Sequence, residues 1–137
     1  MRKNLTLLLF LGLVGCASMV SLSKATAPTR ENLIKISIGM SKQEVINIMG
    51  TKTKEAYYHG GLDKWAFSTI NNPYRSEIIQ GKGKTLEVIY YVTDDKNNDG
   101  AISDDELTPL VFDEGKLIGW GWSFLQDNVQ KYELRMR

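Results

Sequence analysis

The chain has 137 residues with 17 basic and 16 acidic side chains, so its formal net charge at pH 7 is +1. This near-neutral balance excludes the strongly basic surface typical of nucleic-acid-binding domains. A single cysteine and a single histidine exclude an intramolecular disulfide and a zinc site built from several Cys and His ligands. The apolar fraction of 42% is ordinary for one globular domain.

The first sixteen residues have the pattern of an export signal. A positive leader (residues 1–3) precedes an apolar run from Leu5 to Val14, and the small Gly15 stands before Cys16. The run is shorter than the roughly 20 residues of a membrane-spanning helix. Leu13-Val14-Gly15-Cys16 resembles the lipobox of bacterial lipoproteins. The resemblance implies a signal peptide over 1–15 and lipidation of Cys16, whereas cleavage to a soluble secreted form and an uncleaved anchor are the alternatives.

The residue after the cysteine and the segment that follows it predict where the domain sits. Ala17 is not aspartate, and in the lipoprotein family this implies an outer-membrane location facing the periplasm. Residues 16–28 are mostly small and polar, which predicts a lipidated cysteine and a flexible tether. Of the 17 basic residues, Arg2 and Lys3 lie in the leader, so 15 remain against 16 acidic ones. The folded domain is predicted over 29–137.

Two short helices are expected at the start of this domain. Thr29 can cap a helix over residues 30–36. Ser41 and Glu44 form a capping box for the next helix, in which Val45, Ile48 and Met49 make an apolar stripe, and Gly50 ends it.

Strands are expected after Gly50, where the apolar period changes. Residues 65–70 and 86–93 are rich in β-branched and aromatic side chains, so each predicts a strand. A long polar loop is expected over 71–83. Residues 107–112 and 117–124 predict a hairpin around the turn at 113–116, and the tail from Leu125 is either a terminal helix or an extension.

This element order predicts an α+β fold in which two short N-terminal helices pack on an antiparallel meander sheet of three to four strands. Such a two-layer sandwich has its helices on one face of the sheet. The segment from Ile38-Gly39-Met40-Ser41 to Gly50 resembles the start of the SmpA/OmlA (BamE-like) lipoprotein domain. That resemblance implies a non-catalytic accessory role in outer-membrane assembly through contacts with other proteins.

The loop from Asp95 to Glu106 has the register of an EF-hand calcium loop. Side-chain oxygens stand at its positions 1, 3, 5, 9 and 12, Gly100 stands at position 6, and a carbonyl is available at position 7. The calcium ligands are therefore predicted to be Asp95, Asn97, Asp99, Ala101, Ser103 and Glu106. The flanking segments are strand-like rather than helical, and Pro109 limits any exiting helix to about one turn. A solvated hairpin loop without metal is the alternative.

Other candidates are weaker. His59 lies in a glycine-flanked turn without a nucleophile motif, so no catalytic site is predicted. Trp120, Trp122 and Phe124 alternate and would share one sheet face. Core packing and a partner-binding stripe are both possible explanations for this pattern. The partner-binding residues are placed in the polar loop, at Asn72, Pro73, Tyr74 and Arg75.

The sequence thus predicts a membrane-tethered, non-catalytic interaction module that supports outer-membrane assembly or envelope integrity. Its partners are the membrane, through the lipid on Cys16, and one or more envelope proteins. No nucleic acid or small-molecule substrate is indicated. The first alternative is a calcium-binding envelope protein that uses residues 95–106, and the second is an inhibitor of an envelope hydrolase, which rests on fold analogy.

Overall fold

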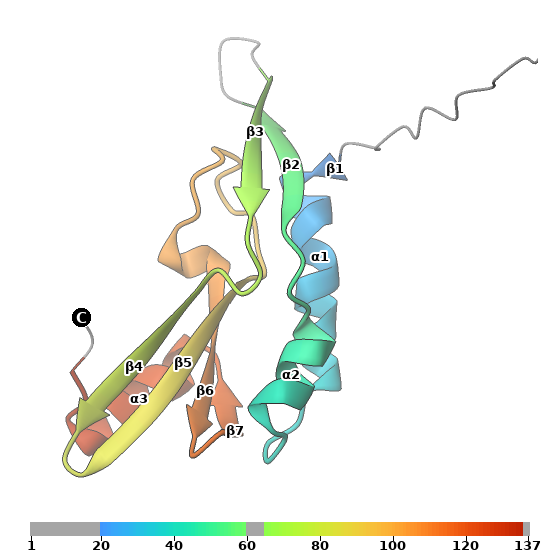
Figure 1. The fold of residues 1–137 in the computed structure, drawn as a ribbon. Coiled ribbons are helices and arrows are strands. Elements are labelled where there is room, and N and C mark those ends of the chain that lie inside the picture. Colours follow the sequence, from blue (N-terminus) through green and yellow to red (C-terminus); the bar gives the residue numbers. More distant parts are fainter. Residues whose placement is uncertain (1–19, 60–64, 136–137) are drawn as a thin grey trace, which may run out of the picture.

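A computed structural model describes residues 20–59 and 65–135, and it confirms the α+β class (Figure 1). The predicted signal peptide, Cys16 and Ala17 lie outside the described residues. No helix within the described ranges is long and apolar enough to cross a membrane.

The strands form two sheets. The first sheet has the order β1-β2-β3, with β1 (Val20–Ser21) parallel to β2 (Lys54–His59) and β2 antiparallel to β3 (Trp65–Ile70). The second is antiparallel, with the order β4-β5-β6-β7: β4 (Arg75–Gly81), β5 (Lys84–Val92), β6 (Leu107–Asp113) and β7 (Lys116–Trp120). The helices are α1 (Leu22–Asn32), α2 (Lys42–Met49) and α3 (Trp122–Tyr132), with 3-10 turns η1 (Leu33–Lys35) and η2 (Asp104–Glu106).

Helix α1 corrects the prediction of a tether that reaches residue 28. The helix begins at Leu22 after Ser21, whose side chain accepts a hydrogen bond from the Lys24 amide. Its buried residues follow the helical spacing i, i+3, i+4, i+7, and they are Leu22, Ala25, Thr26 and Thr29. Thr29 is therefore a buried helical residue and not an N-cap. Three of the four side chains on this stripe are small or polar, which made the segment look like a linker.

Helix α2 is confirmed as predicted. The Ser41 hydroxyl accepts from the Glu44 amide, and the Glu44 carboxylate accepts from the Ser41 amide at 2.8 Å, so both halves of the capping box are present. Gly50 ends the helix with φ +89°. Val45 and Met49 are its buried residues.

The predicted polar loop over 71–83 is wrong, because most of it is strand β4. This strand pairs with β5 from Arg75↔Tyr90 to Gly81↔Lys84, leaving a two-residue turn of Lys82 and Gly83. Gly83 has φ +70°, as expected for a tight hairpin turn that contains glycine. The strand at 86–93 is confirmed as β5, which starts two residues earlier than predicted.

The last predicted strand is too long. Strand β7 ends at Trp120, and α3 starts at Trp122. Trp120, Trp122 and Phe124 therefore do not alternate on one sheet face, since the last two belong to a helix. The predicted terminal helix is correct in type but begins three residues before Leu125.

Helices cover both faces of the sheet at its central strand β5. On β5, alternate residues from Leu86 to Val92 pack with Leu125 of α3 and Leu22 of α1. Ile89 and Tyr91, which point the other way, pack with α2. A strand buried on both faces reads as a continuous apolar run rather than as an alternation, which explains the composition of β5.

Replacing Leu22 with alanine tests the revised domain boundary. Leu22 is only 1% exposed, so Leu22→Ala is expected to lower the free energy of unfolding by about 2–5 kcal/mol. Urea denaturation followed by circular dichroism measures the loss. Ser23→Ala, at the exposed neighbouring position, is the control. Equal stabilities for the two variants would indicate that residues 22–28 form a tether and not part of the folded domain.

Candidate functional site

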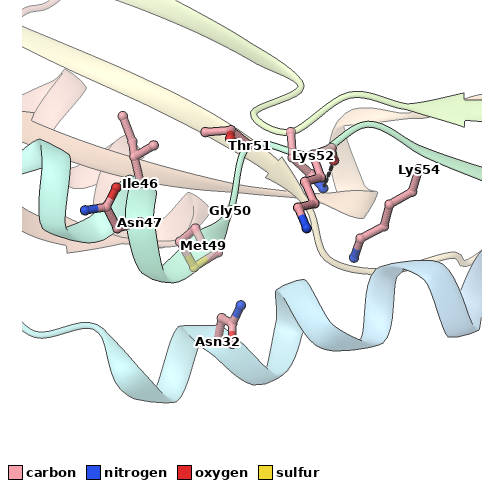
Figure 2. A pocket seen from close by; sticks show the side chains of 9 residues that line it. Asn32, Ile46, Asn47, Met49, Gly50, Thr51, Lys52 and Lys54 are labelled. Atoms are coloured by element: carbon pink, nitrogen blue, oxygen red, sulfur yellow. Dashed lines mark hydrogen bonds between the residues drawn. The ribbon is translucent and has the colours of Figure 1, made fainter.

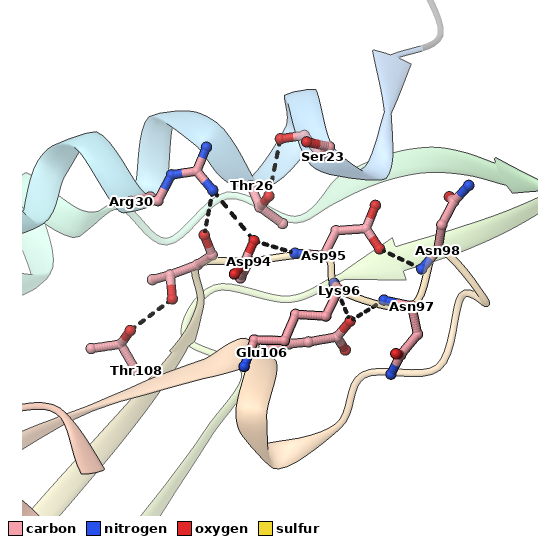
Figure 3. Close-up of polar contacts among 11 residues, drawn as sticks. Ser23, Thr26, Arg30, Asp94, Asp95, Lys96, Asn97, Asn98, Glu106 and Thr108 are labelled. Atoms are coloured by element: carbon pink, nitrogen blue, oxygen red, sulfur yellow. Dashed lines mark hydrogen bonds and ion pairs between the residues drawn. The ribbon is translucent and has the colours of Figure 1, made fainter. Parts of the chain in front are cut away.

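The acidic loop between β5 and β6 is built around the buried side chain of Glu106. This residue is 1% exposed. Its Oε1 atom accepts hydrogen bonds from the amides of Lys96 at 2.8 Å and Asn97 at 3.4 Å (Figure 3). Its Oε2 atom accepts from the Ser103 amide at 2.9 Å. Because a buried carboxylate is costly unless hydrogen bonds satisfy it, the loop backbone closes around this one side chain.

The backbone of Glu106 completes the closure. Its carbonyl accepts from the Thr93 amide at 3.0 Å and the Asp94 amide at 3.2 Å, where β5 ends. Residue 106 thus joins the first and last parts of the loop through both its side chain and its main chain. The prediction that the loop connects two sheet strands is confirmed.

The other predicted calcium ligands make local contacts. Asp95 accepts from the Asn98 amide and Asp99 from the Ala101 amide, each at 3.0 Å. Burial raises the pKa of Asp95 above its ordinary value, against the Asn98 hydrogen bond, and the negative charge of Glu106 adds to the rise. Three charges in and beside the loop are paired with cations, in the ion pairs Arg30–Asp94, Arg75–Asp104 and Lys96–Asp105.

This arrangement fits calcium in ligand type but not in placement. Oxygen ligands are the kind calcium prefers, and Gly100 has φ +74° at the sharp turn. Yet the described residues contain no group of three or more His, Cys, Asp or Glu side chains that could hold a metal ion. Both oxygens of Glu106 already accept amide hydrogens.

The acidic loop also packs against the hairpin of β2 and β3. The Ser68 hydroxyl donates to the Gly100 carbonyl at 3.1 Å. A Cβ atom at Gly100 would lie 2.0 Å from the ring of Tyr58, so only glycine allows this approach. Figure 1 shows the loop beside β3. Through its contacts with Tyr58 and Ser68, the loop joins the first sheet to the second.

The residues predicted to bind a partner are engaged within the molecule. Asn72 is buried at 7% exposure, and its Nδ2 atom donates to the Lys52 carbonyl at 3.2 Å. The Tyr74 amide donates to the Tyr90 carbonyl at 2.8 Å. The Arg75 guanidinium lies 4.3 Å from the centroid of the Tyr90 ring and pairs with Asp104 at 2.9 Å. These contacts give the segment from Asn72 through Pro73 to Arg75 a structural role.

Asn72 also lines an open pocket of about 540 Å³ between α1, the end of α2 and residues 50–54 (Figure 2). Its Oδ1 atom has no hydrogen-bond partner among the described residues. The Lys54 ammonium points toward α1 and donates to the Ala25 carbonyl at 2.8 Å, and burial lowers its pKa. Asn32 donates to the Ile48 carbonyl at 2.7 Å at the C-terminal end of α2, so this pocket is held together by hydrogen bonds across its walls.

The outer edge of β4 is a second candidate, and the sequence prediction missed it. Beside it lies an open groove of about 1180 Å³. Ile78 on this strand is 59% exposed. The groove is lined by Glu77, Ile78, Gln80, Gly81, Lys82, Glu133 and Arg135. The glycine-containing turn at 81–83 was the signal that could have revealed the strand.

Comparison with known proteins assigns a family but no activity. Residues 17–127 match the family model described as a protein of unknown function (DUF3192). Since this region covers most of the chain, the chain belongs to the DUF3192 family. No curated protein and no solved structure matches it.

Replacing Glu106 with glutamine tests whether this side chain holds the loop. The glutamine amide group would face a backbone N–H donor, so one hydrogen bond is replaced by a repulsive contact. Glu106→Gln is expected to lower the free energy of unfolding by about 1–3 kcal/mol without added calcium. Denaturant unfolding measures the change beside Glu114→Gln, at an exposed position in the β6–β7 turn. Unchanged stability of Glu106→Gln would contradict the role given to it.

Proposed function

We propose that this chain is a lipid-anchored envelope protein that acts, without catalysis, as a protein-interaction module. The observation that carries the proposal is the outer edge of β4. An exposed strand edge beside a groove is the arrangement that binds an extended segment of another protein by strand addition. The proposed partner therefore contributes a strand, and its side chains enter the groove at Ile78.

The hydrogen-bonding pattern along β4 supports strand addition. The Gln80 carbonyl accepts from the Arg135 amide at 3.0 Å, so Gln80 directs its main-chain groups to the outer edge. In an antiparallel strand alternate residues face the same edge, and Ser76 and Ile78 therefore do so too. Within the described ranges, the only strand paired with β4 is β5, and Arg135 makes an isolated bridge at its end.

The anchor rests on the lipobox-like sequence that ends in Cys16. The family match begins at Ala17, one residue after this cysteine, and so leaves out the whole predicted signal peptide. An outer-membrane position facing the periplasm follows from Ala17 by the lipoprotein resemblance. An anchored module gains effective concentration toward partners at the same membrane. In this setting the partner would be an envelope protein that supports outer-membrane assembly or envelope integrity.

Photo-crosslinking in cells tests the proposed edge. A benzophenone amino acid at Ile78 is expected to crosslink to an envelope protein, whereas the same group at Ile34, which is 87% exposed and outside the groove, is not. Ser76→Pro removes an edge N–H and is expected to lower the Ile78 crosslink several-fold, because proline is tolerated on edge strands but cannot donate. Equal crosslinking from Ile78 and Ile34 would argue against the edge of β4 as the partner-binding site.

Calcium binding is a second candidate function, favoured by the full EF-hand register of residues 95–106. For it to occur, Glu106 would have to give up amide hydrogen bonds to become a bidentate ligand. Asp95, whose carboxylate is disfavoured by burial and by neighbouring charges, would gain from a cation. Because the pKa of Asp95 is raised in the folded chain, its ionised form destabilises the fold at pH values above that pKa. Protonation removes this destabilisation as the pH falls through the pKa.

A calcium titration of thermal stability tests this candidate. If the site forms, free calcium at 100 times its Kd stabilises the fold by about 2.7 kcal/mol. Asp95→Asn is expected to abolish the calcium effect while leaving the calcium-free fold at least as stable, since asparagine can still accept from the Asn98 amide. Asp127→Asn on α3 is the charge-matched control. A melting temperature that does not respond to millimolar calcium would exclude the candidate.

A further inference from the structure

The outer face of the β2–β3 hairpin exposes aromatic side chains. Trp65 and Phe67 on β3 are each 62% exposed. Phe67 lies directly opposite Tyr57 of β2, and the Tyr57 ring meets the Trp65 ring edge-on at 5.2 Å between centroids. These three residues, Tyr57, Trp65 and Phe67, are called the aromatic face below.

The other face of the hairpin is already occupied. Ala56 and Ile70 are buried in the core with Leu22 of α1. Tyr58 and Ser68, which share this inner side by strand alternation, contact the acidic loop at Gly100. The hairpin is thus fixed from its inner side, and its aromatic face is directed away from the core.

The aromatic face lies at the same end of the domain as the start of the folded chain. Strand β1 pairs with β2 through Val20↔Ala56 and Ser21↔Tyr57, and Figure 1 shows β1 beside the hairpin. From Cys16 to Val20 there are four peptide steps, which span at most about 14 Å. Strand β3 lies two strand spacings, about 10 Å, from β1. A lipid on Cys16 would therefore hold the aromatic face close to the membrane surface.

The kind of exposed residue changes with distance from this end. The exposed isoleucines Ile34 and Ile38, 87% and 70% exposed, follow α1, whose 11 residues extend about 16 Å. They are therefore at the far end of the helix from β1. On the hairpin beside β1 the exposed large apolar side chains are instead Trp65 and Phe67, with the partly exposed Tyr57 next to them. Tryptophan and tyrosine are enriched where membranes meet water.

We propose that the aromatic face of Tyr57, Trp65 and Phe67 contacts the lipid surface beside the anchor. This inference rests on the proposed lipidation of Cys16. The short link from Cys16 to Val20 keeps the hairpin at the membrane, and the aromatic rings enter the headgroup region. The domain then lies against the bilayer, and the Gly81 end of β4, at the end of the molecule opposite β1 in Figure 1, points away from it.

Tryptophan fluorescence of the full-length protein, processed in a bacterium and reconstituted in vesicles, tests the proposal. The vesicles contain phosphatidylethanolamine and phosphatidylglycerol, with or without bromine atoms on their acyl chains near the headgroup. Intact-mass measurement first establishes the lipid on Cys16. Brominated lipid is expected to quench the wild-type emission, and Trp65→Phe is expected to remove most of the quenched part. The signal of Trp120 and Trp122 is expected to remain unquenched.

Two further variants complete the test. Phe67→Ser is expected to reduce the quenching of Trp65 at least several-fold and to shift its emission to the red. Ile38→Ser, at the far end of α1, is expected to change neither. Because Trp65 and Phe67 are largely exposed, circular dichroism should show that Trp65→Phe and Phe67→Ser remain folded.

The possible results separate the two proposals. A chain without lipid on Cys16 contradicts the proposed anchor and the membrane contact together. A lipidated chain whose Trp65 emission is equal in brominated and ordinary vesicles overturns the membrane contact alone. The aromatic face would in that case remain in water and be open to a protein partner.

Discussion

The hydrogen bonds to the buried carboxylate of Glu106 are the interaction on which the arrangement of the two sheets depends. This side chain accepts from amides at both ends of the acidic loop, and so gives the loop one conformation. In this conformation Gly100, which has no Cβ atom, lets the Tyr58 ring pack on the loop backbone, and its carbonyl accepts from the Ser68 hydroxyl. Without these two contacts the hairpin would be held mainly by its connections to β1 and α1.

The loop therefore connects the core to the proposed membrane surface of the protein. Helices α2 and α3 pack on opposite faces of the four-stranded sheet, so this sheet is part of the core that supports the hairpin. The hairpin extends from this sheet and carries Trp65 and Phe67 on the side that faces away from the core. A calcium ion in the loop would act on the same contacts, since Glu106 would have to reorganise to bind it. Calcium binding and the proposed membrane contact would thus depend on the same loop.

The sequence predicted well those elements whose signals are local. The capping box of Ser41 and Glu44 is satisfied by contacts within one turn, and the strand at 86–92 is set by its β-branched and aromatic residues. Helix α1 was missed because its buried stripe uses Ala25 and two threonines, whose burial depends on the distant β2 and β5. The hydroxyl of one of them, Thr26, bonds within its own helix to the Ser23 carbonyl at 3.0 Å. Composition cannot show such tertiary contacts.

For the candidate sites, too, the sequence showed the local signals but not the tertiary contacts. The acidic loop was found from its spacing, but the inward turn of Glu106 onto loop amides is a packing result that spacing does not encode. The β4 edge was hidden because Ile78 and Ile79 stand together in a polar segment, where one is buried at 1% and the other exposed at 59%. Only the pairing with β5 decides which faces the core. The aromatic face likewise needed the register of Tyr57 with Phe67.

Hydrogen exchange of the β2–β3 amides in a Gly100→Ala variant tests the central claim most directly. Gly115 has φ +76°, close to the +74° of Gly100, but a Cβ atom there would meet nothing within 4 Å. Gly115→Ala therefore reproduces the backbone strain without the collision with Tyr58. If the loop braces the hairpin, exchange at Tyr57, Tyr58 and Phe67 becomes faster in Gly100→Ala alone, while β5 and β6 keep their protection. Equal hairpin exchange in the two variants would contradict this account.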